Sequence, residues 1–393
     1  MRILFNIIFS AILAIGLVGF WALFLNLWKP KKKWPAWVGY IIIIGAWFAA
    51  IRYYILNQVD LYGTMYYPLM NMFRTESYGF LFGVFLAIPV FIILSLLYWT
   101  INKIWSKTPE ENRTDRRAFF RTAATIVPLA TIGGSSYAAF AGQQELVVTH
   151  ESFGYTNLPP GLKNYKIVQL SDIHIGPSID LDDFDEILKL ALLQKPNRVV
   201  ITGDLIDKLA WLPQVCERLT TFAKQIPDGV DFILGNHEYH HDVNKVLDAL
   251  KRNTPMNILV NSNIQIMGGK QPVYIAGVAY DNDRKKDNRE AMINKALSGI
   301  PDYAFVILLA HHPEFFEESI ERKIPLTLSG HTHGGQIVFM GMPLVPTGTP
   351  YTKGRYVQEQ SVCYVNNGTG HWFPIRINCP REITVITFFD GVA

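Results

Sequence analysis

Three long uncharged apolar segments occupy the first quarter of this 393-residue chain, and they restrict its fold more than any other feature. The segments cover residues 3–28, 34–51 and 77–102, close to or above the length of about 20 residues with which a helix crosses a bilayer. Residues 1–102 contain only two acidic side chains and no histidine. A large buried helical core is the alternative, but three such segments in succession favour a transmembrane region of three helices.

A fourth uncharged segment, residues 122–142, is weaker because it contains Pro128 and a patch of glycine and serine. It follows a basic stretch that includes the pair Arg116 and Arg117, two phenylalanines and Arg121. This order resembles a twin-arginine export signal, here inside the chain rather than at its start. The alternative is the basic flank of a fourth transmembrane helix, and both alternatives have the same consequence for topology.

The distribution of lysine and arginine predicts the orientation, because positively charged loops stay in the cytoplasm. Residues 29–33 include four lysines, residues 52–76 only two arginines, and residues 103–121 six basic side chains. The stretch 103–121 is therefore expected to be a cytoplasmic linker. If residues 122–142 cross the membrane, the rest of the chain lies outside, and if they rest on the surface it stays in the cytoplasm. We expect a multi-pass protein of the bacterial cytoplasmic (inner) membrane with its catalytic part on the extracytoplasmic side.

Residues 150–393 have a different pattern, in which short apolar strands alternate with amphipathic helices. This alternation is typical of an α/β domain. Three cysteines without paired spacing indicate neither a disulfide framework nor a thiolate metal site. Strands are expected at residues 165–170, 198–201, 230–234, 304–309 and 326–328, a helix at 181–193, and a second helix that includes 216–222.

Each of these five strands is followed within three residues by aspartate, asparagine or histidine. Open α/β sheets bind ligands beyond the carboxyl ends of their strands. One such residue is an ordinary turn former, but five strand ends of this kind are difficult to explain by turn chemistry. The candidate ligands are Asp172, His174, Asp204, Asn236, His311, His331 and His333.

These ligand types favour divalent ions such as Mn, Fe or Zn over a structural thiolate zinc. Seven protein ligands are too many for one ion that must keep an open position, and they suit two ions that share one carboxylate. Two such ions about 3.5–4 Å apart can clamp the attacking and leaving oxygens of an in-line displacement at phosphorus, and they lower the pKa of a water between them. The sequence therefore predicts a two-metal site for phosphate esters.

The motifs that carry these residues, DxH, GDxxD, GNHE, H and GHTH in this order, resemble those of the calcineurin-like binuclear metallophosphoesterases. The resemblance covers about residues 163–388 and implies a sandwich of two mixed β-sheets flanked by helices. It implies that one metal is bound by Asp172, His174 and His333, the other by Asn236, His311 and His331, with Asp204 as the bridge. His237 is then a catalytic residue that stabilises the transition state or protonates the leaving oxygen, held by a carboxylate.

Three further residues have expected roles near this site. Asp207 is expected to hold the 203–207 turn or to contact a ligand. His312 could replace His311, but His311 comes first after the strand and is preferred. The tail resembles the membrane-associated bacterial branch of the same family, in which an arginine lies near the site. Arg376 would then grip a substrate phosphate with bidentate geometry, and a structural ion pair is the alternative.

The expected function is a membrane-anchored, metal-dependent phosphoester hydrolase of the phosphodiesterase type. Its expected partners are the lipid bilayer and a phosphoester substrate, lipid-linked or from the cell envelope. Some enzymes that resemble this branch cleave the pyrophosphate of UDP-diacylglucosamine, so a cytoplasmic pyrophosphohydrolase is one alternative and a non-catalytic metal-binding scaffold is another. A net charge of +3 without a basic, aromatic-interleaved patch argues against nucleic acid as a partner.

Overall fold

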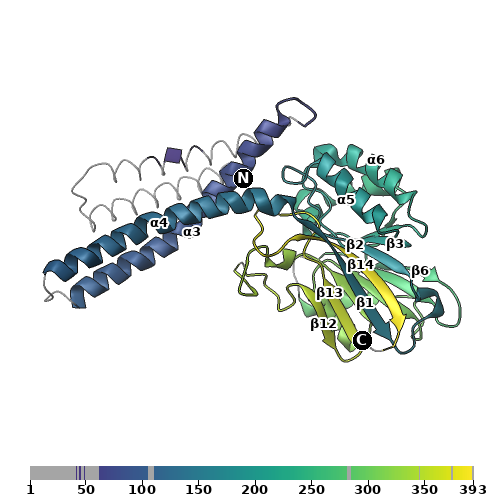
Figure 1. Cartoon of the computed structure of the whole chain (residues 1–393). Coiled ribbons are helices and arrows are strands. Elements are labelled where there is room, and N and C mark those ends of the chain that lie inside the picture. Colours follow the sequence, from purple (N-terminus) through teal and green to yellow (C-terminus); the bar gives the residue numbers. More distant parts are fainter. Residues whose placement is uncertain are drawn as a thin grey trace. The chain divides into compact units, whose positions relative to one another are not determined.

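The structure is a computed structural model that describes residues 41, 44, 45, 48, 62–104, 110–280, 285–344, 346–372 and 375–391. The chain divides into two compact units, Met1–Gly142 and Gln143–Ala393 (Figure 1). Apart from four isolated positions, the expected spans 3–28 and 34–51 lie outside the described residues.

Two long helices, α3 (Tyr67–Ile104) and α4 (Glu110–Gln144), make up the described part of the first unit. Helix α3 contains the whole expected span 77–102, with Pro89 inside it. By length and composition it could cross a membrane over Tyr67–Ile101, and no second helix among the described residues passes the same test.

Helix α4 is continuous through both the basic stretch and the apolar segment 122–142. Residues 110–121 of the expected linker 103–121 are thus helical in the structure. The glutamate, arginine and alanine residues of this stretch have high helix propensity, which explains the helical continuation.

Small residues bring α3 and α4 into close contact. Ser135 Oγ donates a hydrogen bond to the Gly79 carbonyl at 2.7 Å. A Cβ atom added to Gly79 would lie 2.6 Å from Ser136 Cα, and one added to Gly83 would lie 2.5 Å from Ile132 Cα. Glycines four residues apart on one helix face are typical of packing between membrane helices, where the close approach of the backbones replaces hydrophobic burial as the driving force.

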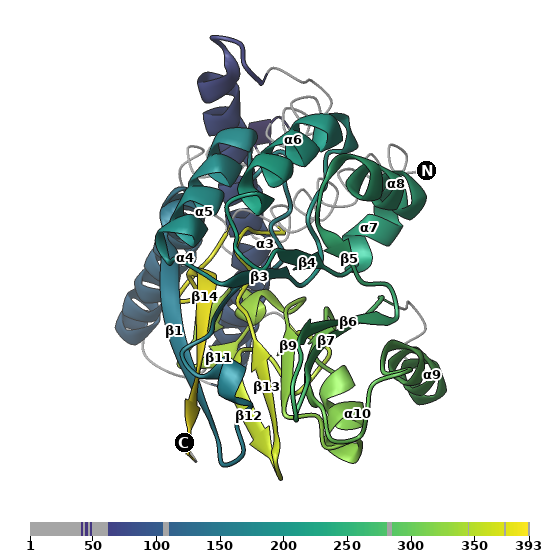
Figure 2. The ribbon, with the colours of Figure 1, turned by 90° about the vertical axis from the view of Figure 1, so that its right-hand side faces the viewer.

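Two six-stranded mixed sheets form the second unit and pack against each other (Figure 2). The first sheet has the order β1-β14-β2-β3-β4-β5 and the second β12-β13-β9-β8-β7-β6. The strands are β1 (Leu146–Tyr155), β2 (Lys166–Leu170), β3 (Arg198–Ile201), β4 (Val230–Phe232), β5 (Asn257–Ile258), β6 (Ser262–Met267), β7 (Val273–Val278), β8 (Phe305–Ala310), β9 (Leu326–Ser329), β12 (Gly354–Gln358), β13 (Ser361–Val365) and β14 (Arg381–Asp390), with a separate hairpin of β10 (Val338–Phe339) and β11 (Met342–Pro343).

Helices cover the outer faces of both sheets, α5 and α6 on the first and α9 and α10 on the second (Figure 2). The helices are α5 (Leu181–Leu193), α6 (Leu212–Ala223), α7 (Asn236–His241), α8 (Val243–Asn253), α9 (Lys286–Ala296) and α10 (Phe315–Glu321), with short 3-10 turns η1 (Pro160–Leu162), η2 (Leu209–Trp211) and η3 (His333–Gly335). The α/β architecture with two mixed sheets agrees with the sequence prediction, and the predicted strand at 198–201 and helix at 181–193 have the same bounds in the structure.

The main core lies between the two sheets. Ile167, Val200 and Ile386 of the first sheet and Ile307 and Leu328 of the second belong to one fully buried apolar cluster. Strands β2 to β5 are parallel to one another, and so are β7, β8, β9 and β13. Because parallel strands end at the same edge of a sheet, the polar segments that follow β2, β3, β4, β8 and β9 come together.

Candidate metal centre

Hydrogen bonds join the strand-end segments across long sequence separations. The Asp172 amide donates to the Gly203 carbonyl at 3.0 Å, and the Gly330 amide donates to the His311 carbonyl at 3.1 Å. The Nδ1 atom of His311 lies 2.8 Å from the Thr202 carbonyl oxygen. These contacts join the segments that follow β2, β3, β8 and β9, and Asn236, after β4, places Oδ1 3.0 Å from His311 Nε2.

The first group of ligands consists of Asp172, His174 and His333. Their ligand atoms lie within 4.8 Å of one another, and all three residues are buried. The Nε2 atoms of His174 and His333 are 3.1 Å apart, and His333 Nε2 is 3.4 Å from Asp172 Oδ1. This is the group that the family resemblance assigns to one metal.

The second group consists of Asn236, His311 and His331. Asn236 Oδ1 lies 3.0 Å from His311 Nε2 and 2.9 Å from His331 Nδ1. The two ring nitrogens are 3.2 Å apart. His312, the alternative to His311, instead packs its ring 4.5 Å from the His331 ring and places Nδ1 3.7 Å from a Glu314 carboxylate oxygen.

Asp204 lies between the two groups. Its Oδ2 atom is 3.5 Å from His174 Nε2 in the first group and 3.4 Å from His311 Nε2 in the second. Its Oδ1 atom accepts a hydrogen bond from the His237 amide at 2.8 Å. One carboxylate thus faces both groups, as a bridging ligand must.

The ligand residues have unusual backbone conformations. Five of the seven have a positive φ, which is costly for residues other than glycine and tends to concentrate at functional sites. They are Asp172 (51°), His174 (54°), Asp204 (53°), His331 (70°) and His333 (50°). No sequence pattern indicates this feature in advance.

Two motif glycines are required because the ligands crowd against them. A Cβ atom on Gly330 would lie 2.0 Å from Ser171 Oγ and 2.2 Å from Asp172 Oδ2. A Cβ atom on Gly235 would lie 2.2 Å from Asp204 Oδ1. Any larger residue at either position would displace the carboxylate of a candidate ligand.

Glu238 supports the bridging aspartate, a role that the sequence reasoning did not identify. It is fully buried and accepts hydrogen bonds from the amides of Gly235 at 2.7 Å, Asp204 at 3.0 Å and Leu205 at 2.8 Å. The signal was present in the sequence, because a glutamate three residues after a helix N-cap typically binds the N-cap amide. Here the same carboxylate also holds the Asp204 segment in place.

Asp207 is the carboxylate that holds His237. Its Oδ1 atom lies 2.6 Å from His237 Nδ1, 3.3 Å from His174 Nδ1 and 3.5 Å from His241 Nε2. Burial opposes ionisation of Asp207, but the neighbouring His174 outweighs it and holds the pKa of this carboxyl well below its usual value. Asp207 therefore links a metal-binding histidine of the first group to His237.

Arg376 does not have the geometry expected for a phosphate-binding residue. It is buried, and its guanidinium donates hydrogen bonds to the carbonyls of Gly370 at 2.7 Å, Asn367 at 2.9 Å and Cys379 at 3.2 Å. Its Nη2 atom also lies 3.2 Å from His333 Nδ1. Among the described residues, the guanidinium is paired with carbonyls rather than with a carboxylate. Arg376 therefore orders the glycine-containing loop at residues 367–370 and the His333 ring, instead of gripping a substrate or forming the alternative ion pair.

This arrangement predicts the effect of replacing Arg376 with methionine, which has similar length but no N–H groups. We expect metal affinity to fall about 10- to 100-fold, as for other residues that orient metal ligands. We also expect a loss of about 3 kcal/mol or more in the free energy of unfolding, because several buried carbonyls lose their donors. Metal titration and thermal unfolding measure both effects. Arg252→Met, at an exposed arginine of α8, is the control, and equal metal affinity in the two variants would contradict the assigned role.

Two histidines of the site have raised pKa values. Burial alone would lower the pKa of His174, but the carboxylates of Asp207, Asp204 and Asp172 outweigh it and raise that pKa to about 9. Burial is likewise outweighed at His311, where Asp204 and Asp172 raise the pKa to about 10. Without metal, both rings are therefore protonated at neutral pH.

Metal binding is therefore expected to release protons from the protein. Imidazole binds a metal only in its neutral form, so metal affinity should rise with pH from 6 to about 10, the higher of the pKa values of His174 and His311. Calorimetric titrations in buffers of different ionisation enthalpy would count the protons released. An affinity that stays constant between pH 6 and 8.5 would rule out this coupling.

The donor set fits divalent metal ions. The seven residues supply imidazole nitrogens, carboxylate oxygens and an amide oxygen, and none of the seven is a cysteine. These ligand types suit ions such as Zn, Mn or Fe. Asp207 also provides the carboxylate–histidine contact that commonly orients a metal-binding imidazole.

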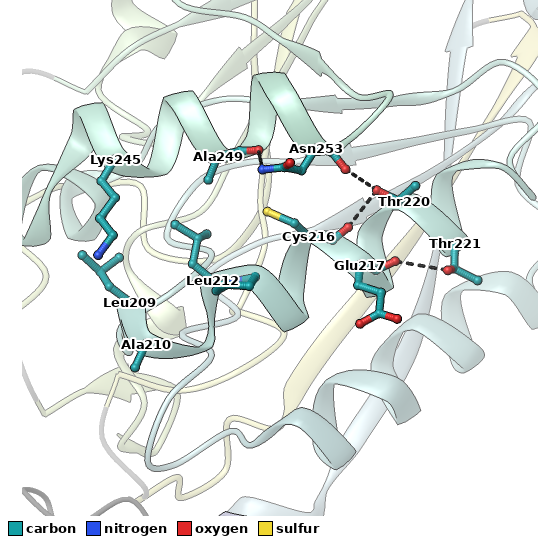
Figure 3. A pocket seen from close by; sticks show the side chains of 11 residues that line it. Leu209, Ala210, Leu212, Cys216, Glu217, Thr220, Thr221, Lys245, Ala249 and Asn253 are labelled. Carbon is teal, nitrogen blue, oxygen red and sulfur yellow. Dashed lines mark hydrogen bonds between the residues drawn. The ribbon is translucent and has the colours of Figure 1, made fainter.

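A separate hollow of about 620 Å³ lies between α6 and α8 (Figure 3). Leu212 and Cys216 of α6 and Lys245 and Ala249 of α8 line it, and none of the seven ligands does. Thr220, which also lines it, donates from Oγ1 to the Cys216 carbonyl of α6 at 2.8 Å and to the Asn253 carbonyl of α8 at 2.5 Å. The hollow is therefore distinct from the metal centre.

Comparisons with known proteins cover the part of the chain that contains these residues. A family model described as calcineurin-like phosphoesterase matches residues 165–335. A metallophosphoesterase of Campylobacter jejuni is 30% identical over 353 residues, which is 88% of this chain and 87% of that protein. A metallophosphoesterase of Bacillus subtilis is 30% identical over 70% of this chain and 98% of its own length. A transmembrane protein with a metallophosphoesterase domain from Danio rerio is 28% identical over 77% of this chain and 71% of its own length.

Proposed function

Because the chain belongs to the calcineurin-like metallophosphoesterases, we propose that this hydrolase is a phosphodiesterase with two divalent metal ions bridged by Asp204. The observation that carries the proposal is the position of Asp204 Oδ2, 3.5 Å from a histidine nitrogen of one ligand group and 3.4 Å from one of the other. Asp172, His174 and His333 hold the first ion, and Asn236, His311 and His331 hold the second.

The side chains around the metals have separate tasks. The metal ions, when bound, would neutralise the phosphate oxygens and lower the pKa of the attacking water. His237 lies at the first group, with its ring 4.4 Å from the His174 ring. Asp207 accepts from His237 Nδ1, stabilises the charged ring and leaves Nε2 to donate a proton to the leaving oxygen.

Hydrolysis of two aryl phosphates tests the reaction class. The full chain in detergent, loaded with Mn or Zn, is expected to hydrolyse bis(p-nitrophenyl) phosphate faster than the monoester p-nitrophenyl phosphate. Preference for the monoester would reject the phosphodiesterase assignment. Turnover restricted to UDP-diacylglucosamine would support the pyrophosphohydrolase alternative, and metal binding without any turnover would support the scaffold.

We also propose that the enzyme is anchored in the bacterial cytoplasmic membrane, with its metal centre on the extracytoplasmic side and a lipid-linked or envelope phosphodiester as substrate. Helix α3, the close glycine contacts between α3 and α4, and relatives described as transmembrane proteins support the anchor. The distribution of lysine and arginine in residues 29–33, 52–76 and 103–121 supports the orientation.

C-terminal fusions decide the orientation in cells. An alkaline phosphatase fusion should be active and a green fluorescent protein fusion should be dark if the C-terminus is outside. The opposite pair of results would place the metal centre in the cytoplasm, and it would favour a nucleotide-linked substrate instead.

A further inference from the structure

We propose that Tyr239 and Tyr280 form the subsite for the substituent that stays on phosphorus, and that this subsite selects an aryl or other planar ring there. The inference rests on the proposed phosphodiesterase function and names the chemistry of its second ester group. It concerns two side chains that none of the motifs of the metal centre includes.

The two tyrosines lie next to the second ligand group. The ring centroid of Tyr280 is 6.2 Å from that of His311 and 6.3 Å from that of His331. Tyr239 is on α7, three residues after Asn236, and its ring centroid is 6.1 Å from that of Tyr280. The pair therefore forms an aromatic wall beside the residues that would hold the second metal.

The orientation of the rings suits a planar group. The Tyr280 plane is tilted by only 34° from that of His331, and by 50° from that of Tyr239. Two tilted faces can pack against one planar substituent by offset stacking and by edge contact, the arrangements that aromatic rings prefer. Tyr239 is 36% exposed and Tyr280 is half-buried, so the wall borders a metal centre whose other side chains are mostly buried.

His237 decides which ester group lies against this wall. Its ring contacts His174 of the first ligand group, whereas the Tyr280 ring contacts His311 and His331 of the second. If His237 protonates the leaving oxygen, the leaving group lies on the side of the first ligand group. The substituent that remains bound to phosphorus then points toward the tyrosines.

A pair of diesters with the same leaving group isolates this contact. Phenyl p-nitrophenyl phosphate and methyl p-nitrophenyl phosphate both release p-nitrophenolate and differ only in the retained substituent. We expect the full-length, metal-loaded enzyme to prefer the phenyl ester in kcat/KM. Tyr280→Leu should reduce this phenyl-to-methyl ratio about three- to tenfold, as expected for loss of one aromatic pair, while Tyr280→Phe should retain it.

Tyr239→Leu provides a second variant, because this side chain is at the surface of α7 and its replacement leaves the core intact. It should lower the same ratio by about two- to threefold, with little change for the methyl ester. An equal loss on both esters in both leucine variants would overturn the subsite and leave the phosphodiesterase function in place. A wild-type enzyme without phenyl preference would also overturn it. No metal-dependent turnover of either ester would overturn the function itself, and the subsite with it.

Discussion

Replacing Asp204 with asparagine is expected to lower metal-dependent hydrolysis by about a thousandfold or more, equivalent to ~4 kcal/mol in transition-state stabilisation. Asparagine keeps an oxygen that can accept from the His237 amide, so the local backbone contact is retained. It removes the negative charge that faces His174 and His311 together. Two ions can no longer share this ligand, and bound metal per protein molecule should fall.

Activity on bis(p-nitrophenyl) phosphate and metal content by mass spectrometry measure the two parts of this prediction. Asp248→Asn is a matched control, because it makes the same chemical change at a side chain that is 68% exposed on α8. If the Asp204→Asn protein retains full metal content and near-normal kcat, Asp204 is not the bridge, and the two-metal proposal fails.

Replacing His237 with glutamine is expected to lower kcat by about 10²- to 10⁴-fold on substrates with poor leaving groups, the usual range for a lost general acid. His237 is not among the seven ligands, so metal content should remain normal. The loss should be much smaller with p-nitrophenolate, because this leaving group departs without a proton. Asp207→Asn should reproduce the same dependence on the leaving group in weaker form, since Asp207 holds His237 Nδ1 at 2.6 Å.

A series of aryl diesters with leaving groups of increasing pKa measures this effect as a change in slope. His150→Gln is the control, a replacement of an exposed histidine on β1 with the same loss of imidazole. An equal loss for every leaving group would show that His237 binds substrate or stabilises charge but does not donate the proton.

The metal centre was largely predictable because its ligands follow parallel strands. A buried strand is recognisable from a short apolar run, and parallel strands end at one edge of a sheet. This rule places together Asp172, Asp204 and Asn236 without knowledge of the fold. The structure also brings together candidate ligands that are far apart in the chain, since Asn236 and His331 are 95 residues apart and share a 2.9 Å contact. The same reasoning preferred His311 over His312, and the structure places His311 beside Asn236.

Other parts of the site depended on contacts that no local pattern encodes. The sequence placed Arg376 near the metals, but its burial and its carbonyl partners come from the packing of the loop at residues 367–370 against the ligand segments. The helical conformation of residues 110–121 in the expected linker, by contrast, follows from local helix propensity, which the sequence analysis did not use there.

The sequence by itself determined the α/β class of the second unit, the positions of its main strands and the choice of the seven candidate ligands. These features depend on hydrophobic periodicity and on residue types at strand ends, which are local properties. The tertiary structure alone decided that Asp204 faces both ligand groups, that Glu238 and Asp207 support them, and that Tyr239 and Tyr280 stand beside the second group. These are contacts between segments far apart in the chain, and only the packing of the two sheets brings such segments together.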